Sequence, residues 1–238
     1  MSKNLIKILA IFIIGMVGGI FADQIFWPYF VERPLFYQYR LEKKPVYVTE
    51  KKEVVIQENT ALTDAIEKVK KVIIGVRTKT ATSKILEGSG LIVTSDGLVV
   101  TLAELVPQGS DFSFFIDGKK VSYQILKRDL KENLALIKIK EPNLPTVSFA
   151  NLDELKLGER IFLVGVIFKK EGPLKIVNEG IVKNFNKDLI STNIFENYLL
   201  AGSSLFNIKG EVLGINTIDS DGQIITIPIS KIKSFIGM

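Results

Sequence analysis

The pattern of hydrophobic and polar positions changes three times along the chain. An almost unbroken apolar run, Leu5–Ala22, comes first. A stretch of mixed charge and proline follows to about Asn59, and a helical period then covers Ala61–Lys71. From Val72 onward, short β-branched runs alternate with glycine-containing turns. This order predicts an apolar helix, a linker and a body rich in β-strands.

The apolar run is long enough to cross a bilayer. Its residues, interrupted only by Lys7, rise roughly 27 Å as a helix, close to the thickness of the hydrocarbon core. The segment extends through Trp27, whose ring suits the membrane interface. A cleaved signal peptide is the alternative, but Ile20 is bulky at the third position before a cut after Ala22, where that pattern needs a small residue. We therefore expect residues 1–27 to form an uncleaved signal anchor, a single-pass transmembrane helix.

Two further features concern the assembly and orientation of this helix. Gly15 and Gly19 form a Gly-Xaa-Xaa-Xaa-Gly pair, which allows close packing of two such helices and makes a homo-oligomer an open option. Lys3 and Lys7 favour a cytoplasmic N-terminus, although several basic residues follow the apolar run as well. The charge pattern alone therefore leaves the orientation open.

Residues 28–59 are expected to form a juxtamembrane linker, because the prolines at positions 28, 34 and 45 disfavour a continuous helix. Asn59 or Thr60 can then cap the helix Ala61–Lys71, which carries Ala65 and Val69 on its apolar face.

The remaining chain reads as many short strands with few helices, which is typical of an all-β barrel or sandwich. A short helix is expected over Ser230–Ile236. The expected strands are Val72–Val76, Gly90–Val93, Leu98–Thr101, Phe112–Ile116, Lys120–Lys127, Leu134–Ile139, Arg160–Val166, Gly180–Asn184, Leu189–Thr192, Leu205–Asn207, Val212–Thr217 and Ile224–Pro228.

Composition excludes several classes of site. The net charge of +5 permits nucleic-acid binding, but acidic and basic residues are interleaved and no dense basic patch with aromatic partners occurs, so we expect no nucleic-acid partner. The chain contains no cysteine, which excludes disulfides, thiolate metal sites and a cysteine nucleophile. It also contains no histidine, which excludes a Ser-His-Asp or Cys-His triad and most zinc sites.

A glycine-containing hairpin near the C-terminal end carries a recognisable motif: Gly202, Leu205, Asn207, Gly210 and Gly214–Asn216. It resembles the active-site hairpin of HtrA/Deg-type, trypsin-fold serine proteases, where a Gly-Asn-Ser-Gly-Gly-Pro-Leu loop leads into a Gly-Ile-Asn strand. Other segments are similar to motifs of that family in the same order: Gly88–Gly97, Val99–Val106, Arg128–Ile139, Leu157–Glu159, Gly180–Val182 and Ile227–Ile229.

The resemblance covers roughly Ala61–Ile236 and implies an all-β, trypsin-like (chymotrypsin) fold. Two six-stranded antiparallel β-barrels are expected, the first in residues 60–150 and the second in residues 151–238, preceded by the N-terminal transmembrane helix. Because members of the family commonly work outside the cytoplasm, the resemblance also favours an extracytoplasmic soluble domain.

The same resemblance aligns three residues with the family's catalytic triad. Glu104 stands at the position of the general-base histidine, Asn133 at that of the orienting aspartate and Ala201 at that of the nucleophilic serine. A methyl group cannot attack a carbonyl, and no imidazole is present to move the proton. In the oxyanion loop, which also contains Gly202, Leu199 stands where the family has a glycine two residues before the nucleophile. Its side chain restricts the backbone geometry that aims the amides. We therefore expect a degenerate member of the family with no enzymatic activity, no cofactor and no metal ion.

The expected function is binding of a peptide or protein partner through the groove between the barrels or a neighbouring edge strand, because strand addition needs no triad. Two alternatives remain. A relocated Ser-Lys site at Ser203 or Ser204 would make the chain a hydrolase. A structural envelope anchor would self-associate through Gly15 and Gly19.

Overall fold

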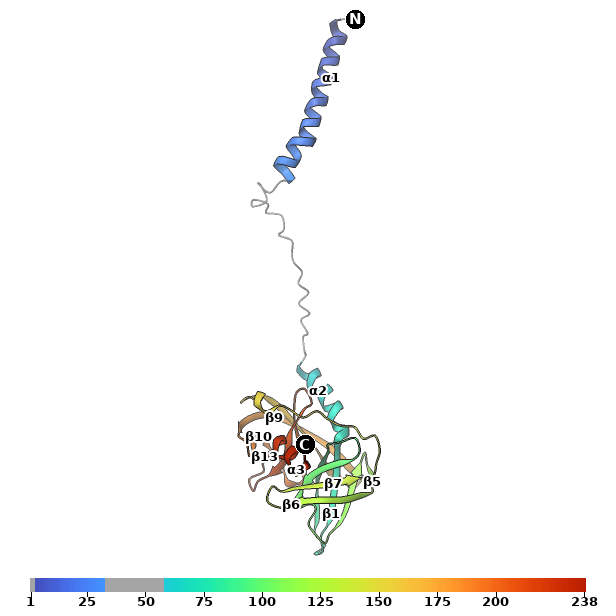
Figure 1. Cartoon of the computed structure of the whole chain (residues 1–238), viewed down its shortest axis with the longest axis vertical. Helices are drawn as coiled ribbons and strands as arrows, with labels where there is room; N and C mark the ends of the chain where they lie inside the picture. The colour runs from blue at the N-terminus through green and yellow to red at the C-terminus, as the bar shows by residue number, and fades with distance from the viewer. Residues whose placement is uncertain (1–2, 33–57) are drawn as a thin grey trace. The chain divides into compact units, whose positions relative to one another are not determined.

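The computed structural model describes residues 3–32 and 58–238, which belong to two units described separately below (Figure 1). The first unit contains α1 (Lys3–Phe21), which continues in the wider, π-type turns of η1 (Ala22–Glu32). Its span Lys3–Trp27 has 25 residues, a mean hydropathy of 2.5 and no buried side chain, so by length and composition it could cross a membrane. Most of the expected linker, residues 28–59, lies outside the described residues, and the part up to Glu32 is helical.

The second unit begins with the helix that the sequence predicts. This helix, α2 (Glu58–Val69), is followed by a single 3₁₀ turn, η3 (Lys70–Val72). Ala65 and Val69 are buried, as expected for the apolar face. The turn at Gly210 lies directly against α2, because a Cβ built on Gly210 would be 3.2 Å from Cγ1 of Val69.

The first β-sheet has seven strands in the order β5-β4-β1-β2-β3-β7-β6. It is formed by β1 (Ile73–Lys79), β2 (Ile85–Ile92), β3 (Leu98–Leu102), β4 (Asp111–Ile116), β5 (Lys119–Val121), β6 (Tyr123–Asp129) and β7 (Leu134–Ile139). A single residue, Ser122, separates β5 from β6. The two edge strands of the sheet are therefore covalently continuous, and the sheet curls back on itself.

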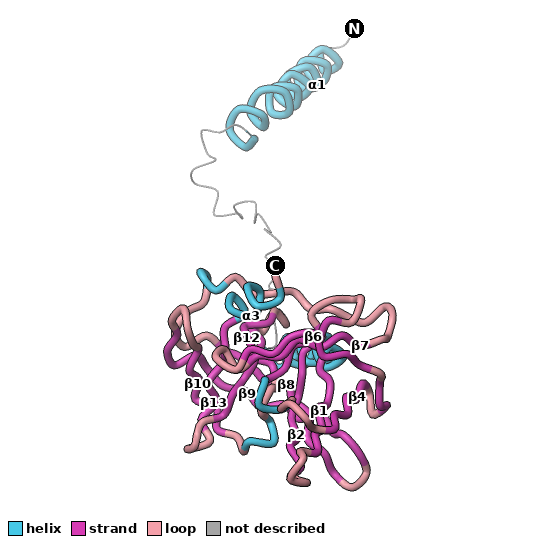
Figure 2. Tube along the Cα trace, turned by 60° about the horizontal axis from the view of Figure 1, so that its bottom comes forward, coloured by secondary structure: helices cyan, strands magenta, loops and turns pink. Residues whose placement is uncertain are grey.

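The second β-sheet is a closed six-stranded barrel in the order β10-β13-β12-β11-β8-β9 (Figure 2). Its strands are β8 (Arg160–Lys169), β9 (Gly172–Phe185), β10 (Ile190–Phe195), β11 (Ser204–Asn207), β12 (Val212–Ile218) and β13 (Gln223–Pro228). Three 3₁₀ turns lie outside the ladders: η4 (Ala103–Leu105), η5 (Leu152–Glu154) and η6 (Tyr198–Leu200). The helix α3 (Ile229–Ile236) follows β13 and confirms the short helix expected over Ser230–Ile236.

The trypsin-like, all-β architecture is thus confirmed, with one difference from the expected pair of six-stranded barrels. The first sheet is a curled seven-stranded sheet, because the expected strand Lys120–Lys127 is divided at Ser122, whose carbonyl accepts a hydrogen bond from the amide of Lys140 (3.1 Å). Two strands also begin earlier than expected, β2 at Ile85 and β9 at Gly172. The early part of β2 runs from exposed Ile85 to buried Ser89, and the early part of β9 is mostly half-buried. Neither segment shows the regular alternation of buried and exposed positions that marks a strand in the sequence.

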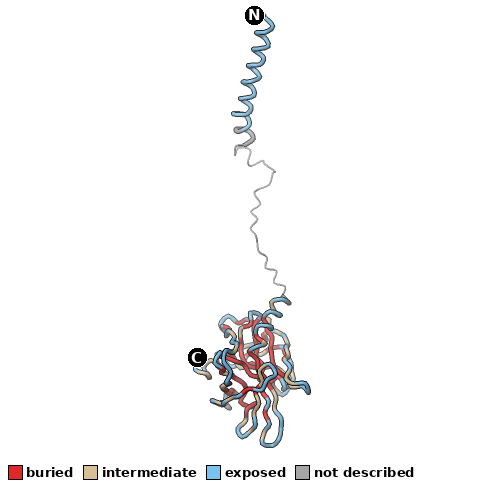
Figure 3. Tube along the Cα trace, turned by 90° about the vertical axis from the view of Figure 1, so that its right-hand side faces the viewer, coloured by how far each residue is buried: buried red, intermediate tan, exposed pale blue. Residues whose placement is uncertain are grey.

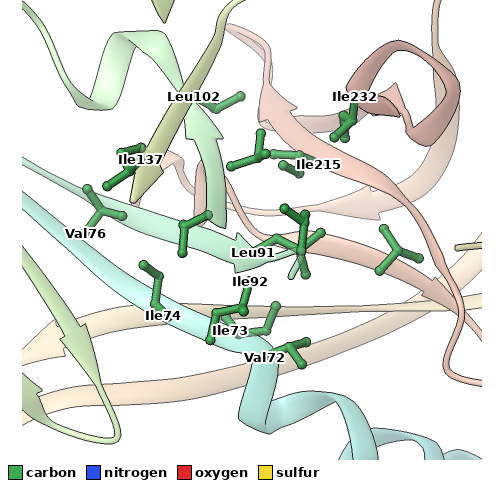
Figure 4. Packing of buried hydrophobic residues seen from close by; sticks show 14 of the residues in the cluster. Val72, Ile73, Ile74, Val76, Leu91, Ile92, Leu102, Ile137, Ile215 and Ile232 are labelled. Carbon is green, nitrogen blue, oxygen red and sulfur yellow. The ribbon is translucent and has the colours of Figure 1, made fainter. Parts of the chain in front are cut away.

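Apolar side chains of both sheets meet in one large buried cluster (Figure 4), and the buried residues lie in the interior of the second unit (Figure 3). Leu91 and Leu102 of the first sheet belong to the same buried cluster as Ile215 of β12 and Ile232 of α3. Phe162 of β8 and Phe206 of β11 stack in this cluster with ring centroids 5.4 Å apart. A smaller second cluster fills the closed barrel. Because the larger cluster takes residues from both sheets, the sheets are held together as one body.

Candidate functional site

A cleft of about 550 Å³ contains several of the residues that the sequence singles out. It is lined by the first part of β2, by η4, by η6 with Ala201, and by the end of β12 with the turn that follows. Glu104, Leu199 and Ala201 all line it. Residues far apart in the sequence, from both sheets, thus come together here.

Asn133 is brought next to Glu104 through the backbone. It occupies the turn between β6 and β7 with φ of 52°, a left-handed conformation that asparagine tolerates better than most residues. Its side-chain Oδ1 accepts a hydrogen bond from the Glu104 amide (3.1 Å), and its carbonyl accepts one from the Ala103 amide (3.1 Å). Asn133 therefore fixes the η4 turn, while the Glu104 side chain is exposed to solvent.

Ala201 is held from the opposite side of the cleft by Ser89 of β2. The Ser89 amide donates to the carbonyl of Ala201 (2.9 Å), and Ser89 Oγ accepts from the amide of Val166 in β8 (2.7 Å). The carbonyl of Ser89 also accepts a hydrogen bond from Thr101 Oγ1 of β3 (2.6 Å). Ser89 is completely buried, so these bonds are shielded from water. One residue therefore connects β3, β8 and the loop at Ala201.

Gly202 is required by this arrangement for two reasons. Its φ is +77°, and a Cβ at this position would be 2.2 Å from the carbonyl oxygen of Ser89. Its amide donates to the Asn216 carbonyl (2.9 Å), which ties the loop to β12. The sequence assigned Gly202 to the oxyanion loop, and the structure gives it this close packing role.

The amides of this loop already have hydrogen-bond acceptors within the chain. Asn197 caps the η6 turn, and its Oδ1 accepts from the Leu199 amide (2.9 Å). The Ala201 amide donates to the Tyr198 carbonyl (3.2 Å). Neither amide points freely into the cleft in the way that an oxyanion hole requires. Sequence reasoning missed Asn197, although asparagine just before a turn of helix is a common capping signal.

The two serines that offered an alternative nucleophile are both fully buried. Ser203 Oγ accepts a hydrogen bond from Nδ2 of Asn216 (3.0 Å), and the Asn216 Oδ1 accepts from Thr226 Oγ1 (2.6 Å). Ser204 Oγ is buried without a hydrogen-bond partner. Within residues 58–238, neither hydroxyl forms a hydrogen bond with a lysine. Both hydroxyls are therefore part of the interior.

Charged groups near the site include ion pairs and carboxylates without an ion-pair partner among the described residues. Glu87 pairs with Arg77 (2.9 Å), whereas Glu104 has no ion-pair partner in the part of the chain that the structure describes. Behind the site, Lys231 of α3 pairs with Asp188 (3.0 Å) and with Glu132, the neighbour of Asn133 (3.1 Å). Hydrogen bonds to Asp188 and then Glu132 raise the pKa of Lys231 above its usual value, so this link between the sheets stays charged at neutral pH.

Comparison with known proteins identifies the family. Residues 88–215, more than half of the chain, match the family described as a trypsin-like peptidase domain. The chain is 35% identical over 164 residues to "Serine protease HTRA1" of Xenopus laevis. It is 29% identical over 136 residues to "Probable periplasmic serine endoprotease DegP-like" of Halomonas elongata. The chain belongs to the HtrA type of the trypsin-like peptidase family.

The alignments cover most of the β-body of this HtrA-type chain but less than half of the length of each relative. They include 63% of the chain and 35% of the Xenopus protein, and 55% of the chain and 29% of the Halomonas protein. The DegP-like protein of Chlamydia pneumoniae is 31% identical over 59% of the chain and 30% of its own length. The chain therefore spans about a third of the length of the curated relatives it matches.

No metal centre accompanies the cleft in the described ranges. Among residues 3–32 and 58–238, no group of three or more acidic side chains lies close enough to hold a metal ion. The cleft offers a hydrophobic rim, a few charged groups and strand backbone, which suit binding of another chain.

We predict that Gly202→Ala strongly destabilises the HtrA-type domain, because the new Cβ would collide with the Ser89 carbonyl at a positive φ. Gly158→Ala is a matched control, since Gly158 has φ of 78° but no atom within 4 Å of an added Cβ. Urea denaturation should show that the control lowers the free energy of unfolding by about 1 kcal/mol, from backbone strain alone. Gly202→Ala should lower it clearly more. Equal losses would contradict the packing role of Gly202.

Proposed function

We propose that this chain is a membrane-anchored pseudoprotease, which binds an extended peptide or a flexible segment of a partner protein in the cleft beside Ala201. The observation that carries the proposal is the use of the Leu199 and Ala201 amides within the η6 turn. With these donors occupied and a methyl group at Ala201, the loop has neither nucleophile nor oxyanion hole. The cleft itself is intact, and binding an extended chain requires only strand backbone and pockets.

The edge that receives the peptide is the end of β12. Asn216 donates its amide to Ser203 and accepts from Gly202, so its backbone faces β11 and the cleft. Backbone groups of alternate residues in a strand point to the same side, so those of Ile218 also face the cleft. The β11 ladder reaches only Ile215, whereas Ile218 lies beyond it and lines the cleft. Ile218 is therefore the natural hydrogen-bonding partner for an added strand.

Absence of proteolysis is the first expected outcome. The purified chain should not degrade casein and should not react with a fluorophosphonate probe, beside an active HtrA protease as positive control. The triple variant Glu104→His, Asn133→Asp, Ala201→Ser should also stay inactive or very slow. Each missing oxyanion donor costs about 10²–10³ in kcat, and the η6 turn remains unchanged in the variant. Labelling of Ser203 or Ser204 would instead establish the Ser-Lys hydrolase.

Peptide binding through β12 is the second expected outcome. Ile218→Pro removes an amide that faces the cleft without removing a ladder bond to β13, so the fold should persist while affinity falls about tenfold or more. Ile218→Ala keeps the amide and is the matched control, for which a smaller loss is expected. Fluorescence anisotropy with labelled ten-residue peptides measures both, and circular dichroism checks the fold. If both variants bind like the wild type, the edge of β12 is not the site.

The N-terminal helix supports anchoring as part of the same proposal. Lys3–Trp27 is suitably long and apolar, and the DegP-like relatives are named as periplasmic, which favours a domain held outside the cytoplasm. Gly15, Gly18 and Gly19 leave open space where a Cβ would stand, and self-association through this face stays a prediction.

Anchoring is tested by alkaline carbonate extraction of membranes from cells that produce the full chain. An uncleaved anchor should leave a 26.6 kDa product in the membrane pellet. Added protease should reach the β-body from the extracytoplasmic side only. A shorter product in the soluble fraction would identify the apolar segment as a cleaved signal peptide.

A further inference from the structure

The cleft beside Ala201 has a charge opposite to that of the chain. Its lining contains three carboxylates, Glu87, Glu104 and Asp219, and one amine, Lys84. Arg77 neutralises Glu87 across the β1–β2 ladder (2.9 Å). The lining therefore has a net negative charge, whereas the whole chain has a formal charge of +5. A positively charged group is attracted to this cleft, although the surface as a whole repels it.

The two remaining acids are held in place by their backbone surroundings. Glu104 lies between the buried residues Ala103 and Leu105, and its amide is bound by Asn133 Oδ1 (3.1 Å). Asp219 Oδ1 accepts hydrogen bonds from the amides of Asp221 and Gln223 (2.9 Å each), which leaves its second oxygen for a ligand. The backbone of Glu104 and one carboxylate oxygen of Asp219 are therefore fixed, while the Glu104 carboxylate is exposed and accessible to a cation.

Large apolar side chains surround these acids. Ile85, Tyr198 and Leu199 line the cleft and are 47%, 61% and 40% exposed. Ile218 lines it as well and offers its backbone for strand pairing. Exposed apolar groups gathered around a cleft are typical of a surface that another molecule covers. The lining thus combines a strand edge, an apolar rim and a negative centre.

We infer that the cleft selects an extended peptide with a lysine or arginine side chain directed to Glu104, flanked by apolar residues that cover Ile85, Tyr198 and Leu199. This inference rests on the proposed peptide-binding function and specifies its ligand. The ligand's cation takes the space next to Glu104, and its backbone pairs with Ile218. Asp219 adds a second negative charge at the same cleft. Arginine meets a carboxylate with two parallel hydrogen bonds, so it binds at least as well as lysine.

The test uses fluorescein-labelled ten-residue peptides that are identical in their apolar positions and carry Lys, Arg, Gln or Glu at the centre. Fluorescence anisotropy with the full chain in detergent should show Lys and Arg peptides binding about three- to fivefold tighter than the Gln peptide, and the Glu peptide binding weakest. The preference should shrink as salt is raised, because the acids are partly exposed.

Glu104→Gln should abolish most of the preference for the Lys and Arg peptides over the Gln peptide. Glu154→Gln is the matched control, because Glu154 is exposed outside this cleft, where it accepts a hydrogen bond from Asn151 (3.0 Å). That variant should keep the full preference.

If the wild type bound all four peptides with equal affinity and Ile218→Pro weakened this binding, the charge selectivity would be overturned. The proposed peptide site would not be contradicted. A preference that persists in Glu104→Gln would also overturn the assignment of Glu104. Failure of the wild type to bind any of the four peptides would overturn both.

Discussion

The structure depends on the buried hydrogen bonds of Ser89. This residue of β2 binds the carbonyl of Ala201 through its amide, the amide of Val166 through its hydroxyl and the hydroxyl of Thr101 through its carbonyl. Loss of one of these hydrogen bonds would leave a buried polar group without a partner, which lowers the free energy of unfolding by about 1–3 kcal/mol. These bonds also determine where the cleft lies, because they fix the loop at Ala201 against the first sheet. Gly202 follows from the same constraint, since only glycine fits so near the Ser89 carbonyl.

Much of the fold could be predicted because its strands are marked by β-branched residues and its turns by glycine. Leu98–Leu102, Leu134–Ile139 and Val212–Ile218 agree with expectation to within one residue. The break at Ser122 could not be predicted, because the residues on either side continue the same strand pattern. The hairpin arm before Gly180 was also missed. Its side chains are only partly buried, so no clean alternation marks it.

Family motifs indicated which residues gather at the cleft, but not the hydrogen bonds that these residues form. Similarity to family motifs singled out Glu104, Asn133, Ala201, Leu199 and Gly202. Glu104, Leu199 and Ala201 line one cleft, and Asn133 binds the backbone of Glu104. The direction of the Leu199 and Ala201 amides depends on a single 3₁₀ turn and on the side chain of Asn197. A few local backbone torsions determine the direction of these amides, and the hydrophobic pattern of the sequence does not predict those torsions.

The larger core cluster, which both sheets share, has a consequence for how the proposed ligand would bind. Phe206 and Ile215 of the closed barrel lie in one cluster with Leu91 and Val100 of the first sheet, so the two sheets cannot move apart without opening that cluster to water. The relative position of the two sheets that carry the cleft is therefore fixed by the core. In the proposed complex the two sheets would not need to move apart, so most of the entropic cost of binding would fall on the incoming chain.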